Sequence, residues 1–209
     1  MFKEILKKLS SDPGILKKKC PEMRTFLHKQ GNTEAQGVGN QPTLQEAAFA
    51  SFLEEHLFKF IIKTETPTKP GFYYKYQLEG SQRSKDFMLI SVTETDRKDV
   101  IVDLKHTTSK TFHLNDGWFE KDIVYIVSWT LKKANKIFIG LGQNIPTEEE
   151  LLRFQELLKL KKEQNTKEKN KTGSLRTCVR FANTYSCNKF TNEYTEEHLT
   201  KTLNFVEMI

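Results

Sequence analysis

Three strand-like segments follow one another near the middle of this chain, and they restrict its possible folds more than any other feature. They span residues 72–78, 87–93 and 100–106 and are rich in aromatic and branched apolar side chains. Polar turns separate them, so consecutive segments can pair as antiparallel strands. Residues 122–129 and 136–139 look like two further strands. The sequence therefore predicts a sheet that begins with antiparallel strands.

Two helices are predicted before these strands. Near the N-terminus, apolar residues recur at helical spacing and predict a short amphipathic helix that docks on the domain rather than on a membrane surface. These residues are Phe2, Ile5, Leu6 and Leu9. Thr43 and Glu46 match a capping box, so a second helix is expected to begin there and to run to about Phe60. Its apolar side is expected to comprise Phe49, Leu53, Leu57 and Phe60.

A long helix is predicted after the strands, because Pro146 and Thr147 precede three glutamates that suit the start of a helix. Its buried stripe is expected to comprise Leu151, Leu152, Phe154, Leu157, Leu158 and Leu160. Residues 161–171 have no apolar side chain, so we expect the frayed end of this helix and an exposed linker. Residues 173–209 are expected to add a hairpin and a short final helix.

This order of elements predicts one α/β domain with a mixed central β-sheet flanked by helices. The composition is that of a soluble globular protein, and no apolar run approaches the roughly 18 to 20 residues that span a bilayer. The three cysteines favour a reducing, intracellular setting over a disulfide framework or a zinc site. The net charge of +6 is compatible with a nucleic-acid partner, although many basic proteins simply have solvated lysines.

Charged residues interrupt the third strand-like segment. Because strand side chains alternate, Asp103 and Lys105 should share one face of the strand, opposite the valines. Antiparallel pairing with the preceding segment should bring Asp86 to the same end. A lone Asp-x-Lys would more often be a surface ion pair. Two converging carboxylates, however, are hard oxygen ligands of the kind that hold Mg²⁺.

Asp86, followed by Asp103-Leu104-Lys105 on an apolar strand, resembles the PD-(D/E)XK nuclease superfamily. The resemblance covers roughly residues 43–130, and Lys85 stands where the family name has proline. It implies a restriction-endonuclease-like core with the order αβββαβ, extending with the N-terminal helix over residues 1–172. Residues 173–209 would then be a DNA-contacting or dimerisation arm of the same domain.

The resemblance also implies a chemistry. Asp86 and Asp103 would hold one or two Mg²⁺ against a DNA phosphate, giving 5′-phosphate and 3′-hydroxyl ends. Lys105 would stabilise charge near the attacking water and assist its deprotonation if the lysine pKa were lowered. Members of the family often have another acid on the first helix, for which Glu46 is the candidate. A helix cap explains Glu46 equally well.

Three polar segments are candidates for contacting DNA, because Arg and Lys suit guanine while Asn and Gln suit adenine. Each could also be an ordinary polar loop. The candidate residues are Asn32, Gln36, Asn40, Gln41, His106, Thr107, Thr108, Ser109, Lys110, Arg176, Arg180, Asn183, Asn188 and Lys189.

Residues 114–126 are similar to segments of Type II restriction endonucleases, and the chain has no helicase or ATPase motif. The resemblance therefore implies a cytoplasmic enzyme, prokaryotic or viral, that acts on double-stranded DNA as a homodimer. Alternatives are a junction resolvase or repair nuclease of the same superfamily, a non-catalytic nucleic-acid-binding module, and a protein-interaction domain.

Overall fold

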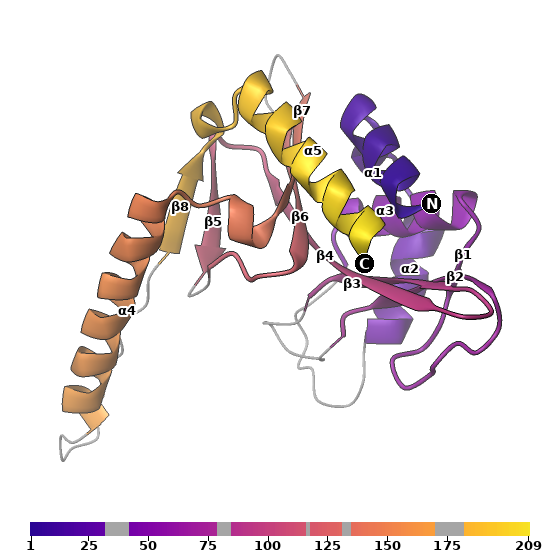
Figure 1. The fold of residues 1–209 in the computed structure, drawn as a ribbon, viewed down its shortest axis with the longest axis horizontal. Coiled ribbons are helices and arrows are strands. Elements are labelled where there is room, and N and C mark those ends of the chain that lie inside the picture. Colours follow the sequence, from indigo (N-terminus) through magenta and orange to yellow (C-terminus); the bar gives the residue numbers. More distant parts are fainter. Residues whose placement is uncertain (32–41, 79–84, 116–117, 131–134, 170–181) are drawn as a thin grey trace.

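A six-stranded sheet of order β1-β2-β3-β4-β6-β7 forms the centre of the protein, as the computed structural model shows in Figure 1. The structure describes residues 1–31, 42–78, 85–115, 118–130, 135–169 and 182–209. The strands of this sheet are β1 (Phe58–Phe60), β2 (Gly71–Tyr76), β3 (Phe87–Val92), β4 (Arg97–Thr107), β6 (Ile123–Thr130) and β7 (Asn135–Leu141). Helices flank the sheet, so the predicted α/β class with a mixed central sheet is confirmed.

The strand pairing brings the segments around the predicted site together. β2, β3 and β4 are antiparallel neighbours, as predicted, and β6 lies parallel to β4 on its other side. The pairing of β3 with β4 sets Phe87 opposite Val102 and Leu89 opposite Val100. One more step along this register places Asp86 beside Asp103.

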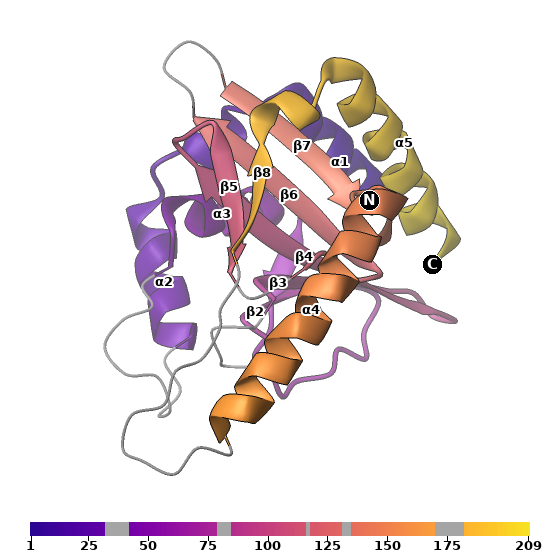
Figure 2. The ribbon, with the colours of Figure 1, turned by 90° about the vertical axis from the view of Figure 1, so that its left-hand side faces the viewer.

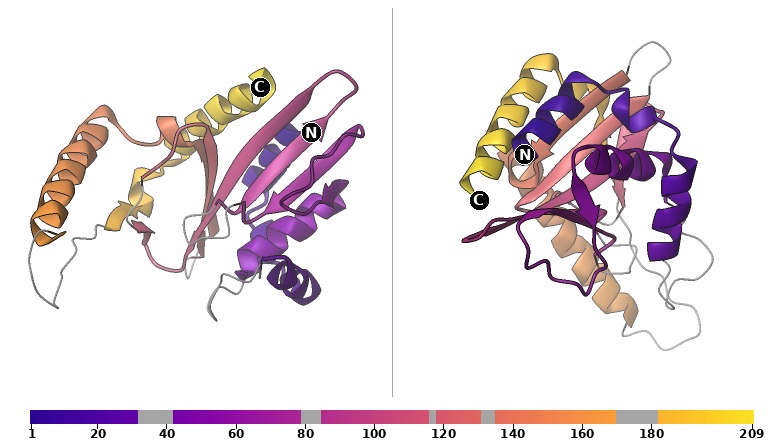
Figure 3. Two further views of the ribbon diagram at one scale, coloured as in Figure 1. Left: turned by 90° about the horizontal axis from the view of Figure 1, so that it is seen from below. Right: turned by 90° about the vertical axis from the view of Figure 1, so that its right-hand side faces the viewer.

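One face of the sheet is covered by helices α1 (Phe2–Ser11), α3 (Leu44–Glu55) and α5 (Asn192–Met208), and α2 (Pro21–Gly31) packs against α3. The two views in Figure 3 show these helices together on that side. The N-terminal helix is confirmed, because all four of its predicted apolar residues are buried in this core. Burial of such a helix against the sheet contributes more to its stability than helix propensity does.

Helix α3 ends earlier than the sequence indicated. Its capping box is present, since Glu46 N donates to Thr43 Oγ1 and Thr43 N donates to the Glu46 carboxylate. The helix ends at Glu55 because Leu57 takes a positive φ of 67° and the chain then enters β1 beside β2. The prediction that Leu57 and Phe60 lie on the helix was wrong.

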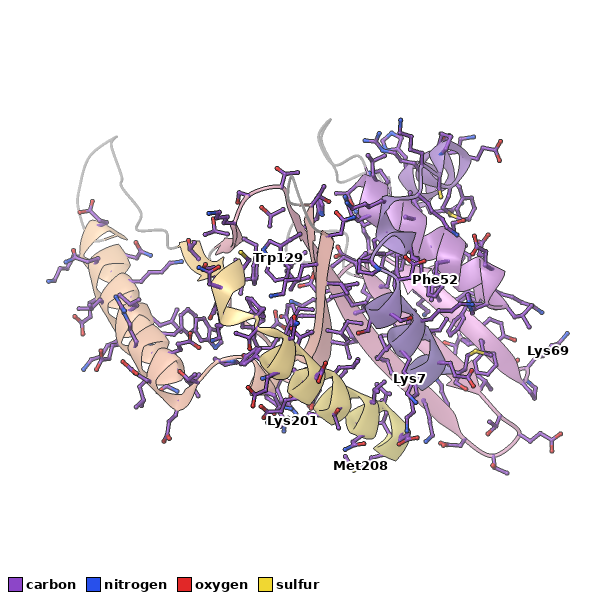
Figure 4. The ribbon with its side chains drawn as sticks, turned by 90° about the horizontal axis from the view of Figure 1, so that it is seen from above. Lys7, Phe52, Lys69, Trp129, Lys201 and Met208 are labelled. Atoms are coloured by element: carbon purple, nitrogen blue, oxygen red, sulfur yellow. The ribbon has the colours of Figure 1, made fainter. Side chains whose placement is uncertain are left out.

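A second, two-stranded sheet covers part of the opposite face. Here β5 (Thr111–Asn115) pairs with β8 (Ala182–Ser186), followed by the short 3-10 helix η3 (Cys187–Lys189). Trp129, labelled in Figure 4, lies against Phe112 and Phe190 between β6 and this small sheet. Aromatic side chains from both sheets and from the segments that adjoin them form this second core, which comprises Phe112, Phe119, Tyr125, Trp129, Phe138, Tyr185 and Phe190.

The described strand near the C-terminus, β8, pairs with the distant β5, because aromatic packing holds the two strands together. The expected local hairpin falls partly on residues 173–181, which lie outside the described residues. Two other expectations for the order of elements were wrong. The final helix has 17 residues and is not short. Among the described residues between β4 and β6, the structure has β5 where the αβββαβ order expects a helix.

Helix α4 (Glu148–Lys169) begins where Pro146 and the glutamates predicted it. It continues through residues expected to fray, and it lies at the left-hand end of the molecule in Figure 1, which is the side that faces the viewer in Figure 2. The predicted buried stripe was wrong, because Leu151, Leu152, Leu158 and Leu160 are exposed.

In the part of the chain that the structure describes, no helix is long and apolar enough to cross a membrane. The two described cysteines, Cys20 and Cys187, are free thiols.

Candidate active site

Asp103 and Lys105 lie side by side on β4. Lys105 Nζ is 2.6 Å from Asp103 Oδ1, and the two residues share one face of the strand. Val100 and Val102 point to the opposite face, into the core under the helices. Asp103 is only 4% exposed, whereas the side chain of Lys105 keeps 29% of its surface accessible. The predicted alternation along β4 therefore brings a buried carboxylate and a partly accessible ammonium together.

Asp86, the residue directly before β3, lies close to this pair. Its Oδ2 atom accepts a hydrogen bond of 2.7 Å from the backbone amide of Leu104, the residue between Asp103 and Lys105. β3 begins only at Phe87, so the Asp86 side chain satisfies an amide of β4 at the end of the strand pairing. The three side chains predicted to converge do so.

Glu46 approaches the same site from the first turn of α3. Its carboxylate accepts a hydrogen bond of 2.9 Å from the hydroxyl of Tyr76, the last residue of β2, in addition to the amide of Thr43. Burial raises the pKa of the Tyr76 hydroxyl, which Glu46 raises further, so this group stays a donor. Glu46 is thus both the helix cap and a carboxylate directed to the end of the sheet where Asp86 lies.

The site has an excess of negative charge. Burial raises the pKa of Asp86 well above its usual range, and repulsion from Asp103 and Glu46 adds to this. Burial likewise raises the pKa of Glu46, although Thr43 and Tyr76 oppose this rise by hydrogen bonding. An additional cation beside these carboxylates would relieve their repulsion.

Lys105 keeps its proton in this environment. Burial lowers its pKa, but attraction to Asp103, Asp86 and Glu46 outweighs burial, so the pKa of the ammonium is raised. A role for Lys105 in deprotonating water required a lowered pKa. In this structure the residue is a fixed positive charge instead.

The donor set is chemically suited to Mg²⁺. Asp86 and Asp103 offer hard carboxylate oxygens. Burial and then repulsion from Asp103 and Glu46 raise the pKa of Asp86, and a divalent cation would relieve that repulsion. Within the described residues, no three His, Cys, Asp or Glu side chains lie close enough to form a metal site by themselves. An ion held by these two aspartates would therefore complete its coordination with water and phosphate oxygens.

Three further residues at the site were missed by the sequence reasoning. Tyr76 donates to Glu46, and Gln77 donates its side-chain amide to the Tyr76 hydroxyl at 3.0 Å. Lys85 Nζ lies 4.0 Å from Asp103 Oδ2 and also pairs with Glu120. The alternation of Tyr74 and Tyr76 is a signal from which burial of Tyr76 could have been predicted, but no sequence signal connects it with α3.

The candidate DNA-contacting residues after Lys105 surround the turn between β4 and β5. His106 Nδ1 lies 2.9 Å from Ser128 Oγ, and Thr107 Oγ1 donates to the carbonyl of Thr111 at 2.8 Å. Thr108, Ser109 and Lys110 are exposed. Because β4 extends to Thr107, the polar loop expected here is shorter than the sequence indicated.

Near the C-terminus, the candidates lie on the second sheet and η3. The backbone of Asn183 pairs with Leu114, and Asn188 is exposed on η3. Lys189 forms an ion pair with Glu150 at the start of α4, so its charge is used within the chain. Six candidates lie outside the described residues: Asn32, Gln36, Asn40, Gln41, Arg176 and Arg180.

Comparison with protein-family models, with curated proteins and with solved structures finds no match to this chain. The geometry and charge of the site itself are therefore the basis for its proposed function.

Proposed function

We propose that this chain is a Mg²⁺-dependent DNA endonuclease of the PD-(D/E)XK type, acting as a Type II restriction enzyme. The observation that carries the proposal is the convergence of Asp86, Asp103 and Lys105. Asp86 is hydrogen bonded to the backbone between the other two residues, which form an ion pair. A merely structural ion pair on β4 would not require a second, buried carboxylate whose pKa is raised by burial and further by repulsion from Asp103.

In the proposed reaction, Asp86 and Asp103 are the residues that would hold a Mg²⁺ ion close to the scissile phosphate. A bound Mg²⁺ supplies Lewis-acid stabilisation of phosphate charge and lowers the pKa of water. Lys105, which remains protonated, stabilises the negative charge that develops on a nonbridging oxygen. Glu46, with its raised pKa, is a candidate for accepting a proton from the attacking water.

Sequence specificity is proposed to come from the polar segments around this site. In the described chain, the exposed residues Thr108, Ser109 and Lys110 follow directly on the strand that carries Asp103 and Lys105. Base edges are read by donors and acceptors of this kind, whereas basic residues contact phosphates. Such an enzyme is expected to act on double-stranded DNA in the cytoplasm of a prokaryotic or virus-infected cell.

Digestion of a sequenced plasmid with and without Mg²⁺ tests the proposal. We expect discrete fragments in Mg²⁺, none in EDTA, and none from Asp103→Asn, which should still bind DNA. Asp99→Asn is the matched control, because Asp99 is an exposed residue of the same strand that pairs with Arg97. Full cleavage by Asp103→Asn would refute the site. Structure-selective nicking would instead indicate a resolvase, and binding without cleavage a non-catalytic module.

A further inference from the structure

Helix α4 exposes apolar side chains that nothing in the proposed nuclease site uses. Leu151, Leu152, Leu158 and Leu160 keep 39%, 56%, 42% and 55% of their surfaces accessible. The helix contacts the rest of the chain through its inner side, where Phe154 stacks on Trp118 with ring centroids 4.2 Å apart. Figure 3 shows α4 at the opposite end of the molecule from α2 and α3.

The exposed leucines are not distributed evenly around α4. Leu151, Gln155, Leu158 and Lys162 follow one another at helical spacing and form one continuous stripe, with Leu152 beside it. Leu160 lies on a different side of the helix, away from this stripe. A helix of this length, about 33 Å, normally covers its apolar stripe with another element.

The charges on α4 are self-complementary. Its first half, residues 148–158, has four acidic side chains and one basic side chain. Its second half, residues 159–169, has five basic and two acidic side chains. Two copies of α4 that cross antiparallel would therefore set the acidic half of each against the basic half of the other. A parallel arrangement would instead oppose like charges.

We propose that the partner of this surface is a second copy of the chain, bound through an antiparallel pair of α4 helices. A two-fold axis near Gln155 places Leu152 at the same level along the helix pair as Leu158 of the partner subunit, on the two edges of the interface. The same axis places Glu148 opposite Lys162 of the partner subunit, so both apolar and charged residues are matched. Such an interface is isologous, because the same stripe on each chain forms both halves.

This dimer does not depend on the proposed nuclease activity, since it rests on α4 alone. It also has a consequence for that activity. Two copies related by a two-fold axis would present two equivalent Asp86–Asp103–Lys105 sites, as cleavage of both strands of a palindromic site requires. The α4 pair therefore supplies a physical basis for a dimer that the sequence suggested only by analogy.

The test is the mass of the full chain, measured by light scattering after size exclusion, without DNA or Mg²⁺. We expect a particle of twice 24.4 kDa at micromolar concentration. Leu152→Glu combined with Leu158→Glu should weaken the dimer by at least 100-fold. Leu160→Glu, the matched control outside the stripe, should leave the dimer intact. A wild-type chain that is monomeric throughout, or a dimer that survives the double substitution, would overturn the proposal.

Charge reversal provides a test that does not alter the leucines. Glu148→Lys alone and Lys162→Glu alone should each weaken the dimer, and the two together should restore it. Oxidation of Gln155→Cys should link two chains, because the proposed axis passes near this residue. If the wild-type chain is a monomer and Lys162→Glu lowers its affinity for DNA, then α4 contacts DNA and the proposed dimer is rejected. Failure to cleave DNA affects none of these outcomes, so the two proposals can fail separately.

Discussion

The backbone amide of Leu104 donates a hydrogen bond of 2.7 Å to the side chain of Asp86. Leu104 separates Asp103 from Lys105, so this single bond fixes the first acid against the strand that carries the other two groups. The backbone of Asp86 is held separately, because its carbonyl accepts a hydrogen bond of 2.8 Å from the amide of Gln77, so the Leu104 amide fixes the carboxylate itself. The geometry of the site is therefore set by backbone pairing as much as by side-chain attraction.

The first prediction concerns Asp86. Asp86→Asn keeps an acceptor for the Leu104 amide and removes a charge that burial and Asp103 disfavour. We expect the free energy of unfolding without metal to be unchanged or raised, while Mg²⁺-dependent cleavage is lost. Asp86→Ala leaves that amide without its acceptor and should lower stability by about 1–3 kcal/mol. Urea unfolding at pH 7.5 measures the difference, and equal stability of the two variants would contradict this account of Asp86.

The second prediction concerns pH and metal. The pKa values of Asp86 and Glu46 are raised in the folded chain, so the folded state binds protons more tightly than the unfolded state. The free energy of unfolding without metal should therefore fall as pH rises from the ordinary carboxylate pKa through the raised pKa values of these two groups. Mg²⁺ at about 100 times its Kd should restore roughly 2.7 kcal/mol at pH 8, but much less at pH 5.5.

Thermal unfolding with Mg²⁺ and with EDTA at these two pH values measures this effect. The control is the Asp86→Asn, Asp103→Asn double variant, for which Mg²⁺ should leave the Tm unchanged. An equal gain in Tm at both pH values, or a gain that persists in the double variant, would contradict metal binding between these two aspartates.

The sequence was most informative where local rules decide the structure. Strand alternation placed Asp103 and Lys105 on one face, and antiparallel pairing through a polar turn placed Asp86 beside them. The capping box at Thr43 also followed from residue types alone. These features depend on the geometry of one strand, one hairpin and one helix start, all of which are encoded within a few neighbouring residues.

Features that depend on distant contacts were not predictable in this way. β8 pairs with β5 across a long sequence separation, because aromatic residues of both strands pack on Trp129 and its neighbours. The leucines of α4 were correctly placed on a helix but wrongly expected to be buried, since helical periodicity does not identify the covering element. Similarly, the bond from Tyr76 to Glu46 depends on how α3 lies against the sheet.

The third prediction concerns Lys105. Lys105→Met removes the ammonium beside Asp103 while keeping an apolar stem of similar length. We expect cleavage to fall by about 10²–10³-fold, because a fixed charge that stabilises the transition state is lost. DNA affinity should change little. Lys98→Met, on the same strand but outside the site, is the control and should cleave normally. Single-turnover rates measure the effect, and a rate within a few-fold of wild type would remove Lys105 from the mechanism.

The fourth prediction separates positioning of Glu46 from its role as a helix cap. Tyr76→Phe removes the hydroxyl that donates to Glu46 but leaves the Thr43 capping box intact. Tyr74→Phe is the matched control, since it removes a hydroxyl that donates to Glu54 at 2.8 Å on the same strand. Both variants should lose roughly 1 kcal/mol of stability from the lost hydrogen bond. Only Tyr76→Phe should lower kcat, with little change in KM, because Glu46 would no longer be held toward Asp86. Equal activity of the two phenylalanine variants would leave Glu46 as a helix cap alone.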